Sequence, residues 1–388
     1  MTNVFTDHKS LDVFRPTVAN IDLDALASNF HSSKAFIGPD LEYMAVVKAN
    51  AYGHGAAPCA KRLETEGADW FAVASVEEGL ELRLAGIQKP ILILGGIWNG
   101  QNALIDHSLT PAVFTISQAA ALNQAASARD TNIDIHLKFD TGMGRVGFRV
   151  ENASEVASEI KNFKNLNVTG MMTHFAVADD LSQNDFTDRQ ISHFHDVVTL
   201  FRSAGFDLKY VDLANSPGAV AHPASRSNLV RLGGILYGLG GDVLPAGIEK
   251  PDLTPVMSVD TKIMQIKDVP RGETIGYSRT FTTERVSVIA TIPIGYHDGF
   301  CRGLSNIGTV IVDDQLAPVV GRVSMDWTTI DVTDIANVQV GDRVTIIGSQ
   351  GSQEIKAEDL AHKLGTISYE ITCGISQRVP RIYSKENL

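Results

Sequence analysis

The residues best suited to chemistry in this chain lie in the segment 43–55, which reads YMAVVKANAYGHG. An apolar run typical of a buried strand ends at Lys48, and small or polar residues follow directly. Burying an ammonium is costly, so such a lysine must reach water, pair with an anion, lose its proton or form a covalent adduct. The glycines and the polar tips of Asn50, Tyr52 and His54 crowd around it, as in a ligand site. Lys48 is therefore a candidate for covalent chemistry.

Composition and charge limit the classes of protein to which the chain can belong. Its 388 residues, 44% hydrophobic and 20% charged, suffice for two globular domains. The net charge of -12 argues against nucleic acid or an anionic membrane as the main partner. No run approaches the roughly 18 consecutive apolar residues of a membrane span, and the first residues lack a secretory signal pattern, so we expect a cytoplasmic protein. Three scattered cysteines predict neither a disulfide framework nor a zinc cluster, and no metal is expected.

Residues 17–240 alternate short apolar runs with amphipathic stretches, the pattern of strand–helix units around a parallel sheet. One helix-like stretch spans 22–36, with Asp22 as its expected N-cap, and another opens with Glu77 and Glu78. Eight such units favour a (β/α)8 TIM barrel, although a doubly wound sheet has the same alternation. The strand candidates are 43–47, 70–75, 90–95, 110–115, 134–139, 167–174, 209–214 and 229–237.

A change of pattern near residue 240 predicts a second domain. The segment 240–255 is rich in glycine and proline and is typical of a linker. Beyond it, runs of β-branched residues and one helix-like segment at 356–364 indicate a mostly β domain, so the fold class is α/β, a TIM barrel followed by a β-rich domain. The expected divisions are an N-terminal segment 1–16 associated with the C-terminal domain, a barrel 17–245 and a β-rich domain 246–388.

Polar residues follow several of the predicted barrel strands, whose carboxyl ends form the working face of such a fold. The fifth strand runs into KFDTGMGRVGF, which sets Lys138 and Arg145 among glycines, and a guanidinium can bind a carboxylate through two parallel hydrogen bonds. The sixth ends at His174, and a lone histidine at such a place is more often a structural residue with satisfied hydrogen bonds than a catalyst. The later strands lead to Asn215, Ser216, Arg231, Gly233 and Gly234. Bare glycine backbone can approach a phosphate closely.

The elements KANAYGHG and KFDTGMGR resemble the corresponding elements of bacterial alanine racemases. Further similar elements follow in the expected order: GYSRTF, IGYHDGF, GRVSMDWTTIDVT and SYEITCGISQRVPRIY. The resemblance extends from about Thr17 to Tyr383. It implies pyridoxal 5′-phosphate (PLP) as cofactor, with Lys48 as the lysine of its Schiff base.

The same resemblance implies a role for each matching residue. Lys48 and Tyr277 would be the two catalytic bases, and Tyr277 would come from the partner subunit, so a homodimer is expected. The implied cofactor-binding residues are Lys48, Tyr52, His174, Asn215, Ser216, Arg231, Gly233, Gly234 and Tyr369. Those implied for the substrate are Arg145 and Met325, supported by Lys138, a possible carbamate that holds Arg145, and by Tyr296 at the entrance. Two positions depart from many relatives: Asp212 stands in place of a histidine, and Ser324 in place of a cysteine.

These residues favour a racemase of L- and D-alanine that supplies D-alanine for peptidoglycan or serves alanine catabolism. In the family Arg231 would donate to the cofactor's ring nitrogen, and since arginine stays protonated, that nitrogen stays unprotonated and the ring is a poorer electron sink. This suits racemisation better than decarboxylation. Three alternatives stay open: a serine or broader-specificity racemase, a PLP-dependent decarboxylase, and a non-catalytic PLP-binding protein. The mouth residues Tyr296 and Tyr369 favour a small substrate.

Overall fold

The computed structural model describes residues 14–384 and divides the chain into two compact units. One unit is Asp22–Val256, and the other combines the described residues up to Ile21 with those from Met257 onward. The predicted N-terminal segment 1–16 lies almost wholly outside the described residues. Within 14–384, no helix is both long enough and apolar enough to cross a membrane.

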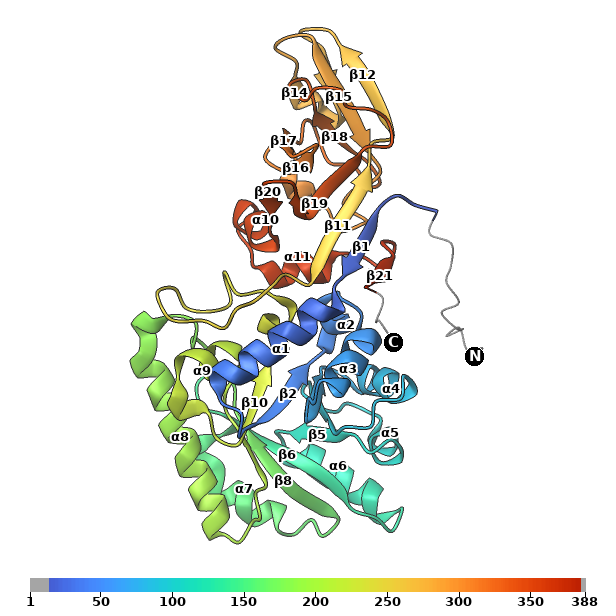
Figure 1. Ribbon diagram of the computed structural model, residues 1–388. Coiled ribbons are helices and arrows are strands. Elements are labelled where there is room, and N and C mark those ends of the chain that lie inside the picture. The colour runs from blue at the N-terminus through green and yellow to red at the C-terminus, as the bar shows by residue number, and fades with distance from the viewer. Residues whose placement is uncertain (1–13, 385–388) are drawn as a thin grey trace. The chain divides into compact units, whose positions relative to one another are not determined.

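Eight parallel strands of the first unit close into a barrel (Figure 1). Neighbours pair in the order β2, β3, β4, β5, β6, β8, β9, β10, and β10 pairs with β2 again, so the sheet has no open edge. This closure confirms the barrel and excludes the doubly wound sheet. The strands lie within or next to the eight predicted runs: β2 (Glu42–Val46), β3 (Trp70–Val73), β4 (Ile91–Ile93), β5 (Thr110–Val113), β6 (Ile133–Asp140), β8 (Leu166–Met172), β9 (Tyr210–Asp212) and β10 (Leu229–Leu232). A short strand, β7 (Phe148–Arg149), pairs only with β6.

Helices surround the barrel and explain why its strands read as unbroken apolar runs. Every residue of β3, β4 and β5 is buried, because one face of the sheet meets the barrel interior and the other meets helices. Helix α1 begins as predicted, since the carboxylate of Asp22 accepts hydrogen bonds from the N–H groups of Asp24 and Ala25 at 2.9 and 3.0 Å. The helices are α1 (Leu23–Ile37), α2 (Lys48–Tyr52), α3 (Ala56–Thr65), α4 (Val76–Leu84), α5 (Gln101–Asp106), α6 (Ile116–Ser127), α7 (Ala153–Ile160), α8 (Asn184–Ser203) and α9 (Ser216–Ala221).

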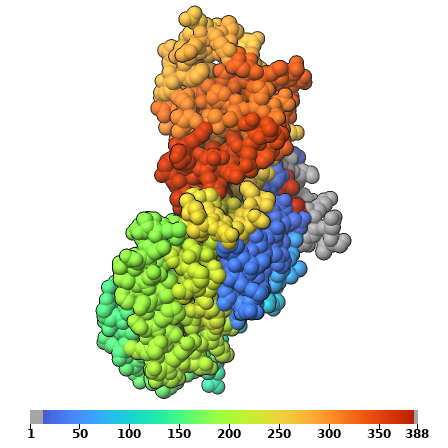
Figure 2. All heavy atoms as spheres, turned by 60° about the vertical axis from the view of Figure 1, so that its left-hand side comes forward, coloured from blue at the N-terminus to red at the C-terminus, as the bar shows by residue number. Residues whose placement is uncertain are grey.

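The predicted linker has no helix or strand between residues 238 and 256, but it packs on the barrel unit. The side chain of Asn29 on α1 donates to the carbonyls of Leu236 and Thr254 at 3.1 and 2.8 Å, and accepts from the N–H of Thr254 at 2.8 Å. Figure 2 shows this segment in yellow beside the blue surface of α1. The side chains of Val243 and Leu244 are buried, so the segment belongs to the barrel and is not a free connector.

The second unit is mostly β, as predicted. Its first strand, β1 (Val18–Ile21), pairs antiparallel with β11 (Met257–Lys262) and parallel with β21 (Arg381–Tyr383), which ties the start of the described chain to its end. The other strands are β12 (Gln265–Val269), β13 (Thr274–Ile275), β14 (Phe281–Thr282), β15 (Ser287–Ile292), β16 (Thr309–Val312), β17 (Gln315–Pro318), β18 (Thr328–Asp331), β19 (Arg343–Gln350) and β20 (Gln353–Ile355).

The expectation of a single helix in this unit is wrong. The predicted helix is present as α10 (Ala357–Leu364), and a second, α11 (Ser368–Gly374), packs against it. The sequence of α11, SYEITCG, includes β-branched residues and glycine, which are weak helix formers. Its packing against α10 supplies the stability that local propensity does not.

Candidate active site

Lys48 lies two residues beyond the end of β2, at the start of a left-handed turn. Ala49, Asn50, Ala51 and Tyr52 have φ values of 52, 55, 53 and 53°, four successive non-glycine residues in a region that side chains disfavour. Left-handed helical geometry costs roughly 1–2 kcal/mol for each such residue. Contacts from elsewhere in the fold must therefore hold this turn in place.

Two aromatic side chains supply part of that support. Nδ1 of His54 donates to the carbonyls of Ala51 and Tyr52 at 2.9 and 3.1 Å, and its ring stacks on Tyr237 with centroids 4.6 Å apart. The hydroxyl of Tyr237 in turn donates to the carbonyl of Val46 at the end of β2, at 2.9 Å. The sequence analysis missed Tyr237, because the sequence presents it only as one more apolar residue after the eighth strand.

The turn brings Tyr52 to a cradle suited to an anion. The N–H of Gly233 donates to Oγ of Ser216 at 2.9 Å. A Cβ placed on Gly233 would lie 2.7 Å from the hydroxyl oxygen of Tyr52 and 4.0 Å from Oγ of Ser216, so the missing side chain leaves room where two hydroxyls converge. Asn215 caps α9 by accepting from the N–H of Gly218 at 3.1 Å, and Gly234 continues the bare backbone. These groups fit the phosphate of PLP.

We expect Gly233→Ala to weaken PLP binding about tenfold, the cost of losing one hydrogen bond to a charged group. The added methyl would occupy the space in front of the Tyr52 hydroxyl. Titration of the cofactor-free protein with PLP measures the loss. Pyridoxal, which lacks the phosphate, is the control and should bind the variant and the parent equally. An equal loss for both compounds would show that the cradle does not hold the phosphate.

Arg231 lies on β10 and is only 3% exposed. Its Nη2 donates to the carbonyls of Thr173 and Leu213 at 3.0 and 3.3 Å, and to Nδ1 of His174 at 3.2 Å. Burial, and then the nearby Arg231, lower the pKa of His174 to about 2, so its ring is neutral and can accept this hydrogen bond. Among the described residues, none accepts from Nε of Arg231, so this N–H can serve a ligand.

Asp212, on the neighbouring strand β9, forms an ion pair with Nη1 of Arg231. Both groups are buried, so the carboxylate and the guanidinium compensate each other's charge within the barrel. An anion thus holds one side of Arg231 while carbonyls hold the other. His136 occupies the same interior, and its pKa is lowered to about 3 by burial and by Arg231, so it adds no charge.

Lys138 and Arg145 lie on β6 and on the loop that follows it. Lys138 is 6% exposed, and its pKa is lowered to about 8 by burial and by the cations Arg231, Arg145 and Lys48. Its amine is therefore far more often neutral near pH 8 than that of an ordinary lysine. The charges of Lys48, Arg145 and Arg231 thus all act on Lys138.

The loop that carries Arg145 is shaped by Asp140. Its Oδ1 accepts from the N–H groups of Gly142 and Gly144, both at 3.0 Å. Gly147 has a φ of 149°, and a Cβ there would lie 2.4 Å from the backbone nitrogen of Asp140, so only glycine fits. Arg145 itself is exposed and so accessible to a solute carboxylate.

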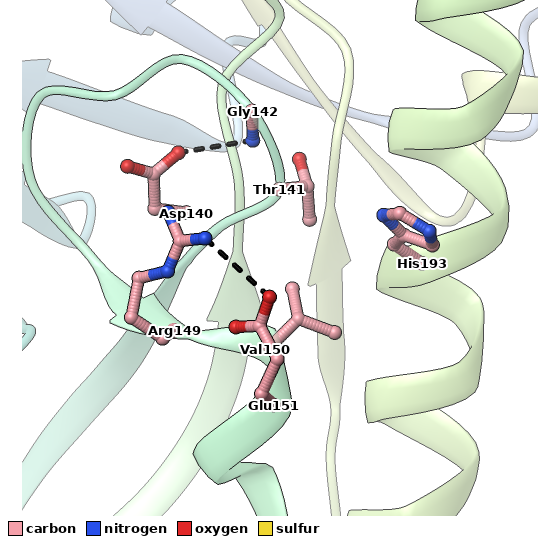
Figure 3. A pocket seen from close by; sticks show the side chains of 7 residues that line it. All are labelled: Asp140, Thr141, Gly142, Arg149, Val150, Glu151 and His193. Carbon is pink, nitrogen blue, oxygen red and sulfur yellow. Dashed lines mark hydrogen bonds and ion pairs between the residues drawn. The ribbon is translucent and has the colours of Figure 1, made fainter.

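A separate hollow of about 270 Å³ lies beside this loop. It is lined by Asp140, Thr141, Gly142, Arg149, Val150, Glu151 and His193 (Figure 3). Arg149 and Glu151 are 62% and 70% exposed and pair with each other at 3.4 Å, while Asp140 is bonded to the backbone of Gly142. Arg149 and Glu151 thus neutralise each other, and Asp140 is bonded to backbone. We therefore place the chemistry at Lys48 and Arg231 and not in this hollow.

The remaining predicted residues lie in the β-rich unit. Tyr277, Met325 and Tyr296 are 72%, 50% and 41% exposed. The N–H of Tyr296 donates to the carbonyl of Ser324 at 2.9 Å, next to Met325, and Gly276 lies against the backbone of Arg322, so these loops are neighbours. Tyr369 is half-buried, near the start of α11.

Ser324 has a structural use for its hydroxyl, which donates to the carbonyl of Trp327 at 2.8 Å. The same oxygen accepts from the N–H of Trp327 at 3.2 Å. These two bonds close the turn that carries Met325. Ser324 therefore stabilises the loop through its oxygen.

A closed (β/α)8 barrel with a lysine, an anion cradle and a buried arginine at its strand ends defines a barrel enzyme that binds a small phosphorylated cofactor. The N-terminal domain model of alanine racemase matches residues 21–240, and the C-terminal domain model matches residues 256–383. The chain belongs to the alanine racemase family, whose members are PLP-dependent isomerases.

Curated relatives and solved structures agree with this assignment over nearly the whole chain. The alanine racemase of Geobacter sulfurreducens is 43% identical, covering 95% of this chain and 97% of its own. That of Halothermothrix orenii is 42% identical, covering 96% and 98%. The crystal structure of alanine racemase from Bacillus anthracis with bound L-Ala-P has a TM-score of 0.91 at 36% identity, covering 97% of each chain. Alanine racemase from Bartonella henselae, with covalently bound pyridoxal phosphate, has a TM-score of 0.85 at 30% identity, covering 95% and 99%.

Proposed function

We propose that this protein interconverts L-alanine and D-alanine with PLP held by Lys48 and with two bases, Lys48 and Tyr277 of the partner subunit. The observation that carries the proposal is the convergence of a strand-end lysine, the Tyr52–Ser216–Gly233 cradle and Arg231 in one barrel of an alanine racemase fold. When bound, the cofactor would draw electrons from Cα of the amino acid and acidify its proton.

Lys48 and Tyr277 would divide the proton transfer between the two faces of Cα. With D-alanine, Nζ of Lys48 takes the proton and the hydroxyl of Tyr277 supplies one on the opposite face; with L-alanine the roles exchange. A tyrosine hydroxyl has an ordinary pKa near ~10, so it requires positive surroundings or a hydrogen-bond partner to act as a base near neutral pH.

The binding groups would orient the amino acid between these bases. Arg145 would hold the substrate carboxylate through its planar fork of donors. Nε of Arg231 would donate to the cofactor's ring nitrogen, and because arginine stays protonated, that nitrogen stays unprotonated. Asp212 offsets the charge of Arg231 by pairing with Nη1, not with Nε. This arrangement supports a racemase over a decarboxylase.

We expect Lys138 to add carbon dioxide, which exchanges an N–H bond for an N–C bond and releases one proton. The reaction needs a neutral amine, and since the pKa of Lys138 is about 8, the neutral fraction rises as the pH rises through that value. Carbon-13 NMR of protein in labelled bicarbonate should show a carbamate signal that grows between pH 7 and pH 9. Lys138→Gln should lose the signal and Lys61→Gln should keep it. A spectrum in which neither substitution changes the signal would contradict the assignment.

The function itself is tested by two measurements on the purified protein. Its absorbance before and after borohydride reduction reports whether PLP is covalently held, and a chiral assay reports interconversion of the alanine enantiomers. Serine, lysine and arginine should turn over more slowly than alanine. Faster turnover of any of them would show that alanine is not the preferred substrate. Release of carbon dioxide would show that the protein is a decarboxylase. Cytoplasmic location, and a role in peptidoglycan synthesis or alanine catabolism, stay predictions.

A further inference from the structure

The left-handed turn after Lys48 has a third support, which comes from helix α4. Oε1 of Glu78 accepts from the N–H of Ala49 at 2.8 Å, and Oε2 accepts from the N–H of Ala74 at 2.7 Å. One carboxylate thus joins the residue after Lys48 to the residue after β3. Glu78 is half-buried, and its helix begins immediately after Ala74 and Ser75.

This contact differs from the local one that a glutamate makes in a capping box. Ser75 and Glu78 have the spacing of a capping box, in which the glutamate would bond back to the N–H of its own N-cap residue. Ser75 does accept from the N–H of Glu78, at 3.4 Å, but the carboxylate of Glu78 bonds to Ala74 and across to Ala49. Glu78 therefore stands at the N3 position of a capping box, but its carboxylate bonds to the residue after Lys48.

The hydrogen bond to Ala49 supports the backbone at the start of the strained left-handed turn. Ala49 is the first of the four left-handed residues, and its own N–H belongs to the peptide group that joins it to Lys48. His54 and Tyr237 hold the far end of the turn and the end of β2, so Glu78 holds the near end. Hydrogen bonds to a charged acceptor are about twice as strong as those between neutral groups.

We infer that Glu78 is a positioning residue for Lys48, one that fixes the peptide group before Ala49 so that the lysine amine is aimed at the cofactor aldehyde. This inference rests on the proposed function. Within residues 14–384 the carboxylate of Glu78 accepts hydrogen bonds from the N–H groups of Ala49 and Ala74, and neither belongs to the cofactor cradle, so its effect should be confined to the covalent bond with Lys48.

Comparing the binding of two ligands distinguishes this positioning role from a general structural role of Glu78. PLP can bond covalently to Lys48, whereas pyridoxine 5′-phosphate has the same ring nitrogen and phosphate but no aldehyde. Glu78→Gln retains the size of the side chain but can accept only one of the two N–H groups. We expect this variant to bind PLP about tenfold more weakly than the parent and to bind pyridoxine 5′-phosphate with unchanged affinity.

Glu77→Gln is the matched control. Glu77 lies in the same first turn of α4 and carries the same charge, but it is exposed and does not contact Ala49, so both affinities should match the parent. Glu78→Asp tests reach, because the shorter carboxylate keeps the charge but cannot span both N–H groups; it should behave as Glu78→Gln. Circular dichroism verifies that each variant is folded.

An equal loss for the two ligands, or no loss for either, would overturn the role of Glu78 and leave the proposed function intact. A parent protein that binds neither ligand would overturn the proposed function and this inference with it. If Glu77→Gln also weakened the binding of PLP alone, the effect would come from negative charge at the start of α4, and the positioning role of Glu78 would be overturned.

Discussion

Replacing Lys48 by alanine should abolish covalent attachment of PLP and lower the rate of alanine racemisation by roughly 10⁴-fold. Lys48 follows β2 at the carboxyl end of the barrel, and it would be both the attachment point and the base for one face of Cα. The loss is expected to be so large because one substitution removes two functions. Borohydride reduction followed by peptide mass spectrometry would locate the attachment, and the chiral assay would give the rate.

Lys61→Ala is the control for this experiment, because Lys61 is an exposed lysine on the neighbouring helix α3. It should keep both the attachment and the rate of the parent. The cradle residues are untouched in Lys48→Ala, so the variant should still bind PLP noncovalently. Reduced cofactor found on a lysine other than Lys48 in the parent would contradict the assignment.

Tyr277→Phe should retain the absorbance of covalently bound PLP but lose racemisation starting from L-alanine by roughly 10²–10⁴-fold, the usual contribution of a positioned acid or base. The ring is 72% exposed in the single chain, so loss of one hydroxyl should not disturb the core. In heavy water, the Cα proton of D-alanine should still exchange, because Lys48 is intact. Racemisation of both enantiomers at the parent rate would refute the two-base proposal.

A mixing experiment tests whether Tyr277 acts across a dimer. A chain with Lys48→Ala still offers Tyr277, and a chain with Tyr277→Phe still offers Lys48. If each site takes one residue from each subunit, a mixed dimer has one intact site, and an equal mixture after subunit exchange should recover about a quarter of the parent activity. Failure to recover activity in demonstrated mixed dimers would place both bases in one chain.

The sequence predicts the barrel well because its signal is local. Each strand is a short run of apolar residues, and these runs recur with amphipathic stretches between them, so β2 and β10 could be located without the fold. The cap of α1 is equally local, since Asp22 bonds to residues two and three positions ahead. The helix α11 could not be predicted in this way, because it depends on packing against α10.

The candidate site also has a part that local sequence predicts and a part that depends on the fold. The sequence by itself predicts which residues carry chemistry, namely Lys48, Arg145, Arg231 and Tyr277, because the motifs that contain them, and their resemblance to those of alanine racemases, are properties of the chain. Only the tertiary structure decided how the barrel residues are held. The bond from Glu78 to Ala49 joins residues 29 positions apart, and that from Tyr237 to Val46 joins residues 191 apart. A strained turn such as 49–52 exists only where distant groups offset its cost, and those groups meet only once the barrel has closed.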